Sequence, residues 1–181
     1  RFVNKYTASA RAMITREMPM EAVIERHTMF PYYVRFLPRQ RRERALQALV
    51  NMNENFHNIL HVPQQQTKQY LRYCPVCATE DRDKYGETYW HRSHQMTGIH
   101  ICAEHFCQLQ NSNVMISSTC SPTFITAEEA VPETETVMQS QNPLECQLAE
   151  YVMQVFQARI DMQGDIAIGR FLHSRMEHTK Y

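Results

Sequence analysis

The sequence predicts a mainly α-helical protein with a small cysteine-rich ribbon between two helical segments. Apolar residues recur at helical spacing near both ends of the chain, and long β-type alternation is scarce. Cysteine, histidine and aromatic residues are concentrated between Cys74 and Leu109. We therefore expect a helical segment with a basic helix over residues 1–70, the ribbon over 71–120, and a linker with a C-terminal helical segment over 121–181.

The first segment is expected to hold three helices. Pro19 suits the first turn of a helix that continues to about Phe30, and an aromatic connection follows up to Leu37. Apolar spacing predicts a second helix from Arg39 to about Asn58. A third helix is expected from Gln64 to Leu71.

The rest of the chain is expected to contain short strands, a linker and two helices. Tyr89–His91 and Ile99–Ile101 are candidate strands, and Asn111–Glu135 has the composition of irregular structure or a linker. Asn142 followed by Pro143 starts a helix that reaches about Ile160. A final helix is expected over Asp165–Glu177.

Composition gives broad limits on function. Lys plus Arg and Asp plus Glu both number 19, so the formal net charge is zero and charge alone does not indicate a nucleic-acid partner. A neutral chain can still carry a basic face. The sequence contains no run of about eighteen apolar residues, so no membrane span is predicted. No signal peptide is visible either, and we therefore expect the six cysteines to lie in a reducing cytoplasm. Since Arg1 rather than Met begins the sequence, we expect a fragment of a longer protein.

Two paired motifs predict a metal site. Cys74 and Cys77 form a C-x-x-C pair, and Cys102 and His105 form a second pair with the same internal gap, with 24 residues between the two pairs. Zinc prefers four thiolate or imidazole ligands in a tetrahedron, and two such pairs supply them. With four protein ligands no coordination position is open, so the predicted site holds one structural zinc ion rather than a catalytic one.

Other interpretations of the same residues stay open. Cys74 and Cys77 could be a redox pair or ordinary buried thiols. The fourth ligand could also be a different side chain, with Cys107 as the best rival to His105; the candidates are His91, His94, His100 and Cys107. Cys120 and Cys146 are interpreted as non-ligands.

A group of arginines and a group of aromatic residues are candidate nucleic-acid contacts. The arginines cluster around the start of the second helix, where phosphates would be a suitable partner or where they would form a solvated charged face with Glu43. They are Arg35, Arg39, Arg41, Arg42 and Arg44. Tyr85, Tyr89 and Trp90 could stack on bases, although aromatics beside a zinc site more often form its small core.

Longer strings in the chain resemble one protein family. The strings run through the cysteine-rich segment and also include an upstream His-Thr-x-Phe-Pro stretch. They are Leu71–Cys77, Glu80–Asp81, Lys84–Glu87, Tyr89–Arg92, His94–Gln95, Cys102–His105 and His27–Tyr33. Together they resemble the TniQ/TnsD family of bacterial transposon target-site selection proteins, over about Met18 to Leu109.

The resemblance implies a non-enzymatic role in DNA transposition. Family members select the insertion site, some by binding target DNA and recruiting an AAA+ ATPase, others by docking on a CRISPR RNA-guided effector without reading sequence directly. It also implies that Cys74, Cys77, Cys102 and His105 bind zinc, and a bacterial, nucleoid-associated location. A zinc-dependent nuclease is the competing function from another class, and a water-bearing zinc position beside a carboxylate would favour it.

Overall fold

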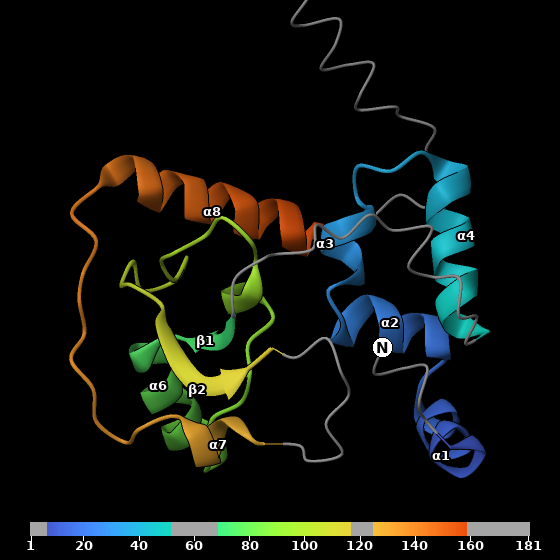
Figure 1. The fold of residues 1–181 in the computed structure, drawn as a ribbon, viewed down its shortest axis with the longest axis horizontal. Helices are drawn as coiled ribbons and strands as arrows, with labels where there is room; N and C mark the ends of the chain where they lie inside the picture. Colours follow the sequence, from blue (N-terminus) through green and yellow to red (C-terminus); the bar gives the residue numbers. More distant parts are fainter. Residues whose placement is uncertain (1–6, 52–68, 117–124, 159–181) are drawn as a thin grey trace, which may run out of the picture. The chain divides into compact units, whose positions relative to one another are not determined.

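The computed structural model describes residues 7–51, 69–116 and 125–158, and these form two compact units (Figure 1). One lies within residues 1–64 and is called the N-terminal unit here. The other lies within residues 65–158 and is called the central unit. Helices dominate both, and the strands form one small two-stranded sheet in the central unit. The described part is thus mainly helical with a minor β component, as the sequence predicts.

The N-terminal unit contains four described helices. They are α1 (Ala8–Glu17), α2 (Met20–His27), α3 (Phe30–Val34) and α4 (Arg39–Val50). Thr7 caps α1, since its hydroxyl accepts a hydrogen bond from the Ala10 amide. Prolines stand just before α2 and α4, at Pro19 and Pro38, where their fixed φ suits a helix start.

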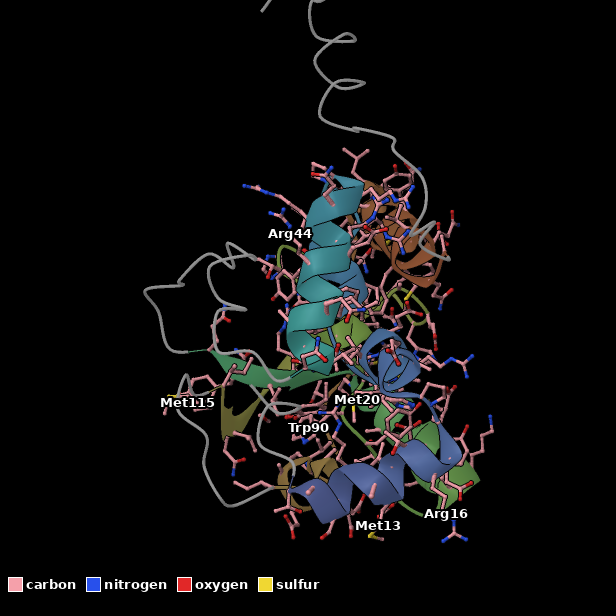
Figure 2. All side chains as sticks on the ribbon, turned by 90° about the vertical axis from the view of Figure 1, so that its right-hand side faces the viewer. Met13, Arg16, Met20, Arg44, Trp90 and Met115 are labelled. Atoms are coloured by element: carbon pink, nitrogen blue, oxygen red, sulfur yellow. The ribbon has the colours of Figure 1, made fainter. Side chains whose placement is uncertain are left out.

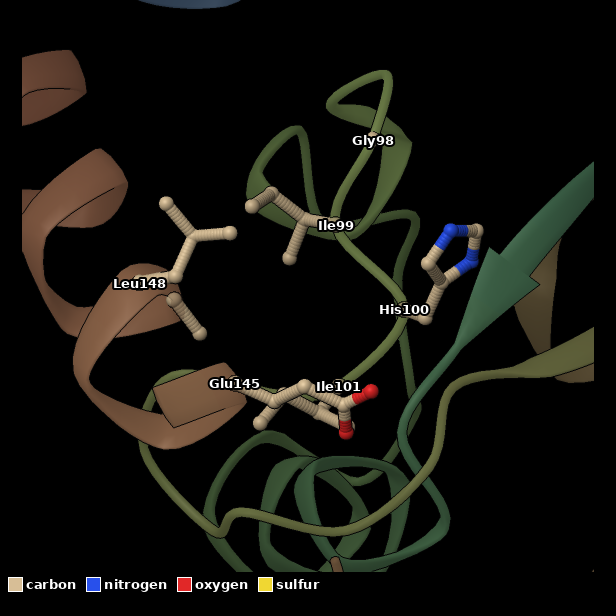
Figure 3. A pocket seen from close by; sticks show the side chains of 7 residues that line it. Gly98, Ile99, His100, Ile101, Glu145 and Leu148 are labelled. Atoms are coloured by element: carbon tan, nitrogen blue, oxygen red, sulfur yellow. The ribbon is translucent and has the colours of Figure 1, made fainter. Parts of the chain in front are cut away.

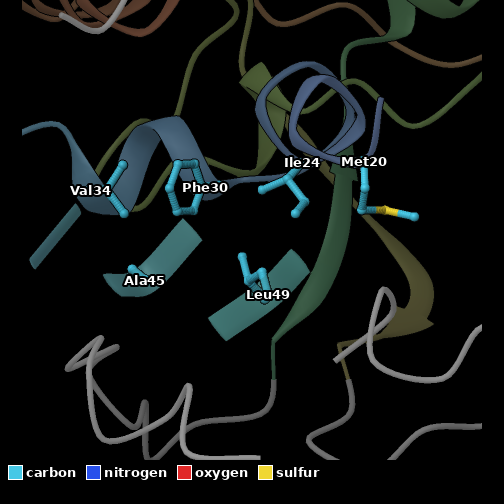
Figure 4. Close-up of a cluster of buried hydrophobic side chains, with 6 residues drawn as sticks. All are labelled: Met20, Ile24, Phe30, Val34, Ala45 and Leu49. Carbon is cyan, nitrogen blue, oxygen red and sulfur yellow. The ribbon is translucent and has the colours of Figure 1, made fainter. Parts of the chain in front are cut away.

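A single apolar cluster holds α2, α3 and α4 together. Side chains from all three helices point into one space (Figure 4), and they are Met20, Ile24, Phe30, Val34, Ala45 and Leu49. Ile24 and Val34 are completely buried. Burial of these side chains is the main favourable term in folding this unit.

The His-Thr-x-Phe-Pro stretch forms the corner between α2 and α3. The Thr28 hydroxyl donates to the Ile24 carbonyl at the end of α2 and accepts from the Phe30 amide at the start of α3. Phe30 then enters the core, with Pro31 buried beside it. The stretch therefore has a clear structural role, because it turns the chain and anchors it at the same point.

The N-terminal predictions are partly confirmed. The helix expected at Pro19–Phe30 is present, but it ends at His27 where the Thr28 corner begins. The aromatic connection after it was expected to be irregular, and its first half is the helix α3. Helix α1 was not predicted, because its apolar spacing is weak and none of its residues is buried. The second predicted helix begins at Arg39 and is described to Val50, and the rest of its expected length lies outside the described residues.

The central unit combines a two-stranded antiparallel sheet with helices. Its elements are β1 (Tyr70–Tyr73), α6 (Pro75–Tyr85), the 3₁₀ turn η2 (Ser93–Gln95), β2 (Gln110–Met115), α7 (Ala127–Ala130) and α8 (Pro143–Gln157). Strand β1 pairs with β2 in a register that joins Arg72 to Asn111 and Tyr73 to Gln110, with an irregularity towards Tyr70. This pairing brings the residues just before Cys74 beside the residues just after Leu109.

Several predictions for the central unit were wrong. The helix expected over Gln64–Leu71 ends in residues that form strand β1, while residues 64–68 lie outside the described part. Asn111–Glu135 was expected to be a linker, yet it contains β2 and α7. In both places pairing between distant segments decides the structure, because β1 and β2 contain many polar residues and show little alternation on their own.

The other predictions for this unit are confirmed in part. Tyr89–His91 forms no strand, and within Ile99–Ile101 only Ile101 makes an isolated bridge, to Gln108. Helix α8 begins as predicted, with Asn142 accepting from the Leu144 amide and Pro143 in the first turn. It ends at Gln157, three residues before the predicted end, and the helix expected over Asp165–Glu177 lies outside the described residues.

Among the helices that the structure describes, none has the length and apolar character needed to cross a membrane.

The core of the N-terminal unit generates a first prediction. Replacing Ile24 by Ala should destabilise this unit by about 2–5 kcal/mol, because the buried side chain leaves a cavity among α2, α3 and α4. Met13→Ala, at a side chain that is 74 % exposed, is the matched control and should change stability by less than about 0.5 kcal/mol. Denaturant unfolding followed by circular dichroism measures both, and equal effects of the two variants would contradict this account of the core.

Candidate metal centre

The first cysteine pair lies where strand β1 passes into helix α6. Cys74 is the N-cap of α6, and its sulfur accepts a hydrogen bond from the Cys77 amide at 3.4 Å. Pro75 occupies the first helical position, so the chain turns sharply between the two cysteines. The turn brings both sulfurs to one side, and the positive end of the helix favours a thiolate at Cys74.

The second pair lies in a tight turn between residues 101 and 108. The Cys102 amide donates to the Cys107 carbonyl at 2.8 Å, and the Phe106 amide donates to the Cys102 carbonyl at 2.9 Å. Phe106 adopts a left-handed backbone with φ of 52°, which is uncommon for a residue with a side chain. This turn reverses the chain so that Cys102 and His105 face the first pair.

The four predicted donors converge into one cluster. The Nδ1 atom of His105 lies 3.6, 3.3 and 3.7 Å from the sulfurs of Cys74, Cys77 and Cys102. The sulfurs of Cys77 and Cys102 are 3.7 Å apart, and all four donor atoms lie within 4.8 Å of one another. The three cysteines are buried, so the cluster is largely shielded from water.

These separations suit a tetrahedral metal ion. With metal–sulfur bonds of about 2.3 Å and a metal–nitrogen bond of about 2.0 Å, a tetrahedron has sulfur–sulfur edges of about 3.8 Å and sulfur–nitrogen edges of about 3.5 Å. The distances of 3.3–3.7 Å between these donors lie close to those edges. The donor set could therefore hold a metal ion with little rearrangement.

Glu80 orients the imidazole of His105. The Nε2 atom of His105 lies 3.2 Å from a carboxylate oxygen of Glu80, on helix α6. When Nε2 carries the proton and donates it to this carboxylate, Nδ1 is left with its lone pair directed at the three sulfurs. A carboxylate behind a histidine is the usual way in which a metal-binding imidazole is held in one tautomer.

Cys107 and His94 lie close to the four donors without completing the same set. The sulfur of Cys107 is 3.3 Å from the sulfur of Cys74, and the Nε2 atom of His94 is 3.7 and 3.9 Å from the sulfurs of Cys77 and Cys102. As hydrogen-bond donors to thiolates, both side chains would stabilise the negative charge on the sulfurs. Sequence spacing marked both as candidates but did not reveal this arrangement around the cluster.

A second possible group consists of Cys77, His91 and His94. The rings of His91 and His94 are stacked, with centroids 4.6 Å apart and planes 20° from parallel. Since imidazole lone pairs lie in the ring plane, two stacked rings direct them side by side rather than towards one ion. His91 also lies 2.7 Å from Asp81 through its Nε2 atom, so this group suits a metal less well than the first. His100 is exposed and faces a different part of the unit.

The crowded thiols resist losing their protons together. Hydrogen bonds from Cys102, Cys107 and Cys77 lower the pKa of Cys74, so one thiolate forms readily. Hydrogen bonds with Cys102 and then Cys74 raise the pKa of Cys77. Hydrogen bonds with Cys74, and its negative charge, raise the pKa of Cys107 and raise that of Cys102 to about 11. A cation at the centre would offset the repulsion among several thiolates, which is the chemistry that a bound metal supplies. Burial lowers the pKa of His94 to about 3, so this ring stays neutral.

Strand β1 is held in place by a side-chain amide that acts like a neighbouring strand. The amide of Gln95 accepts from the Arg72 backbone N–H at 3.0 Å and donates to the Arg72 carbonyl at 2.7 Å. The same amide nitrogen donates to the His91 carbonyl at 3.1 Å. The guanidinium of Arg72 donates to the carbonyls of Met96 and Ile99. The loop over residues 91–99 is thereby fixed to the strand that leads into Cys74.

Aromatic and charged residues brace the outer side of helix α6. Trp90 packs against a small apolar cluster of Tyr73, Ala78, Ala127 and Val131, and its indole N–H donates to the Ile125 carbonyl. Arg82 donates to both carboxylate oxygens of Glu128 and to the carbonyls of Val131 and Pro132. Trp90 thus belongs to the small core beside the cluster, while Tyr85 and Tyr89 remain more than half exposed.

The five predicted arginines of the N-terminal unit lie in different environments. Arg42 is only 4 % exposed and donates to the Leu37 carbonyl, so it supports the fold rather than the surface. Arg39 pairs with Glu43 at 2.9 Å, and burial lowers the pKa of the half-buried Arg35. Arg41 and Arg44 are exposed, and Figure 2 shows Arg44 on helix α4. The expected surface cluster is therefore reduced to two exposed cations.

The fold and the cluster together define the class of protein: it is helix-rich and contains a Cys/His module that could hold a metal ion. Comparison with known proteins makes the assignment specific, since the TniQ family model matches residues 9–109, more than half of the chain. The chain belongs to the TniQ family. The match includes α1, upstream of the region that the sequence motifs indicated.

A curated relative supports the same assignment. The chain is 29 % identical over 94 residues to the transposon Tn7 transposition protein TnsD of Escherichia coli. The matched region is 50 % of this chain but 18 % of the relative, so the chain spans less than a fifth of that protein's length.

The strand-like role of Gln95 generates a second prediction. Gln95→Ala should destabilise the central unit by about 1–3 kcal/mol, because it leaves backbone groups of Arg72 and His91 without their partner. Gln95→Glu should be at least as damaging at neutral pH, since a carboxylate oxygen then faces two carbonyl oxygens.

Unfolding followed by the fluorescence of Trp90, the single tryptophan of the chain, measures the effect in this unit. The exposed Gln157→Ala on helix α8 is the control. An unchanged transition in both Gln95 variants would show that this amide does not hold the strand.

Proposed function

We propose that the central unit binds one structural zinc ion through Cys74, Cys77, Cys102 and His105. The proposal is supported by the donor chemistry, three thiolates and one imidazole, which favours zinc over harder cations such as magnesium or calcium. It is also supported by the near-tetrahedral spacing of the four donors and by the carboxylate behind His105. When bound, zinc supplies charge compensation and a rigid link between the two turns.

A closed set of four protein ligands leaves no position for a reacting water molecule. We therefore propose no enzymatic activity for this site. Metal-assisted hydrolysis, the alternative of a nuclease, would need an open coordination position, and four protein donors leave none.

The zinc proposal predicts the metal content of purified variants. The chain should contain about one zinc per molecule, and Cys74→Ser combined with Cys77→Ser should lose the metal and unfold the central unit. Cys146→Ser, on helix α8 and not a member of the donor group, should retain both metal and fold. Elemental analysis gives the metal content, and Trp90 fluorescence reports the fold.

The fourth ligand is tested by a matched pair. His105→Ala should lose zinc, whereas Cys107→Ser should retain it, because only His105 lies with the other three donors inside 4.8 Å. The reverse pattern would assign the fourth position to Cys107 and contradict the proposed set.

We further propose that the chain acts in target-site selection for DNA transposition, as an adaptor between a target and the transposition machinery. The observation that carries this proposal is the family match over residues 9–109, together with the similarity to a Tn7 transposition protein. An AAA+ ATPase of the transposition system is the expected protein partner, and target DNA is the expected nucleic acid. The zinc module then serves as a rigid scaffold.

Arg41 and Arg44 are the cations that best fit a contact with DNA in the described part of the N-terminal unit. Both are exposed on helix α4, one helical turn apart, so they lie on adjacent parts of one face. Arginine binds phosphate oxygens well, and such contacts give affinity with little dependence on base sequence.

Charge reversal tests this contact. Arg41→Glu with Arg44→Glu should weaken binding to a mixed-sequence DNA duplex by about tenfold or more. The slope of the logarithm of the binding constant against the logarithm of the salt concentration should fall by the amount expected for the loss of about two phosphate contacts. The control is Arg16→Glu with Arg26→Glu, which changes the net charge equally at exposed sites on α1 and α2. Gel-shift titrations at several salt concentrations measure both, and equal losses would mean that only net charge matters.

A second mode is docking on a CRISPR RNA-guided effector with no direct reading of DNA. The zero net charge of the chain favours this mode, because it gives no general attraction to nucleic acid. One experiment separates the two modes: the chain is incubated with DNA alone and with a guide-RNA effector. Retention by the effector without a shift of DNA would favour docking, and the opposite result would favour direct binding.

A further inference from the structure

Helix α8 carries a line of apolar side chains that stay exposed among the described residues. Leu144, Leu148 and Tyr151 are 73 %, 51 % and 64 % exposed. They stand at positions i, i+4 and i+7, so they lie above one another along one face of the helix. A single exposed leucine is ordinary, whereas an aligned set of this kind is typical of an interaction surface. We call this line the α8 stripe.

The opposite face of α8 already holds the helix in place. Ala149 is 1 % exposed, and the guanidinium of Arg92 lies 5.1 Å from the ring centroid of Phe156. Ala149 lies about 140° around the helix from Leu144 at 100° per residue, so the packed face and the stripe are different surfaces. The exposed stripe is therefore not needed to fix α8 on the central unit.

A small pocket opens beside the stripe (Figure 3). It lies between α8 and the loop over residues 98–101, and Leu148 faces Ile99 across it. Its lining is mostly apolar and it is open to solvent, and its space is far smaller than that of a small-molecule site. It suits at most one apolar side chain of a protein partner.

The charges on α8 indicate the chemistry of that partner. The helix carries exposed carboxylates at Glu145 and Glu150, and its sequence from Pro143 to Gln157 contains no lysine or arginine. Glu145 also lines the pocket. A phosphate backbone would be repelled here, whereas lysine or arginine beside an apolar anchor would be attracted.

We propose that the α8 stripe and its pocket bind an amphipathic helix of a partner protein that carries apolar residues at i, i+4 and i+7 flanked by lysine or arginine. One apolar side chain of that helix enters the pocket, and its cations pair with Glu145 and Glu150. This is helix-on-helix recognition, with an apolar anchor for affinity and charge for orientation. The inference rests on α8 and the adjoining pocket, and it holds whether or not the chain selects transposition targets.

The test uses the full chain and a labelled synthetic peptide. The probe is a helical peptide of about 15 residues with leucines at i, i+4, i+7 and i+11, lysines beside them and alanine elsewhere. A second peptide has glutamate in place of every lysine, and a third has the same composition as the first with the leucines scattered. Fluorescence anisotropy measures binding of each.

The first peptide should bind, and both others should bind at least about tenfold more weakly, a difference of about 1.4 kcal/mol. Leu144→Ser with Leu148→Ser should weaken its binding by about tenfold or more, whereas Met13→Ser, at an equally exposed apolar residue, should have no effect. Glu145→Lys with Glu150→Lys should reverse the preference towards the glutamate peptide. A variant that had merely unfolded would bind both peptides weakly, so a reversed charge preference cannot result from loss of folding.

Three outcomes would overturn the proposal. One is equal binding of the ordered and scattered peptides. Another is a photo-crosslinker at position 144, which is outside the pocket lining, that joins α8 to residues of the same chain; this would make the stripe an internal contact. The last is a chain that self-associates through the stripe, seen when the leucine variants convert a dimer to a monomer in sedimentation experiments while the peptide fails to bind.

Discussion

The central unit depends on the meeting of two short turns, one at Cys74 and Cys77 and the other at Cys102 and His105. Each turn is fixed locally, by the N-cap of α6 in one case and by the left-handed residue Phe106 in the other. In the proposed zinc site a cation joins them, since several thiolates this close together would otherwise repel one another. The β1–β2 pairing, the Gln95 amide and the Glu80 carboxylate then hold this arrangement from three sides.

The two units are stabilised in different ways. The N-terminal unit has a continuous apolar core made by α2, α3 and α4. The central unit instead combines small apolar clusters with many side-chain hydrogen bonds to backbone carbonyls, above all from Arg72 and Arg82. A segment with so little apolar core is the kind of structure that a bound metal stabilises most. This contrast fits the location of all six cysteines within residues 65–158.

The surfaces of the chain also differ in chemistry. Helix α4 exposes arginines, while helix α8 exposes leucines, a tyrosine and carboxylates. The first suits phosphate and the second suits a basic protein helix, so the two faces would not compete for one partner. The adaptor role that we propose requires contact with more than one component, and chemically distinct faces would be a physical basis for it.

The sequence alone determined the residue types and the local turns. The paired cysteine motif, the Asn142–Pro143 helix start and the apolar spacing of α2 are local signals, because a cap, a proline or a helical face acts over a few residues. The family strings are also local. Only the tertiary structure decided the strand pairing of β1 with β2, the burial of Arg42 and the placement of His94 and Cys107 against the thiolates. Each of these depends on segments far apart in the chain coming together, and no local pattern records which distant atoms will meet.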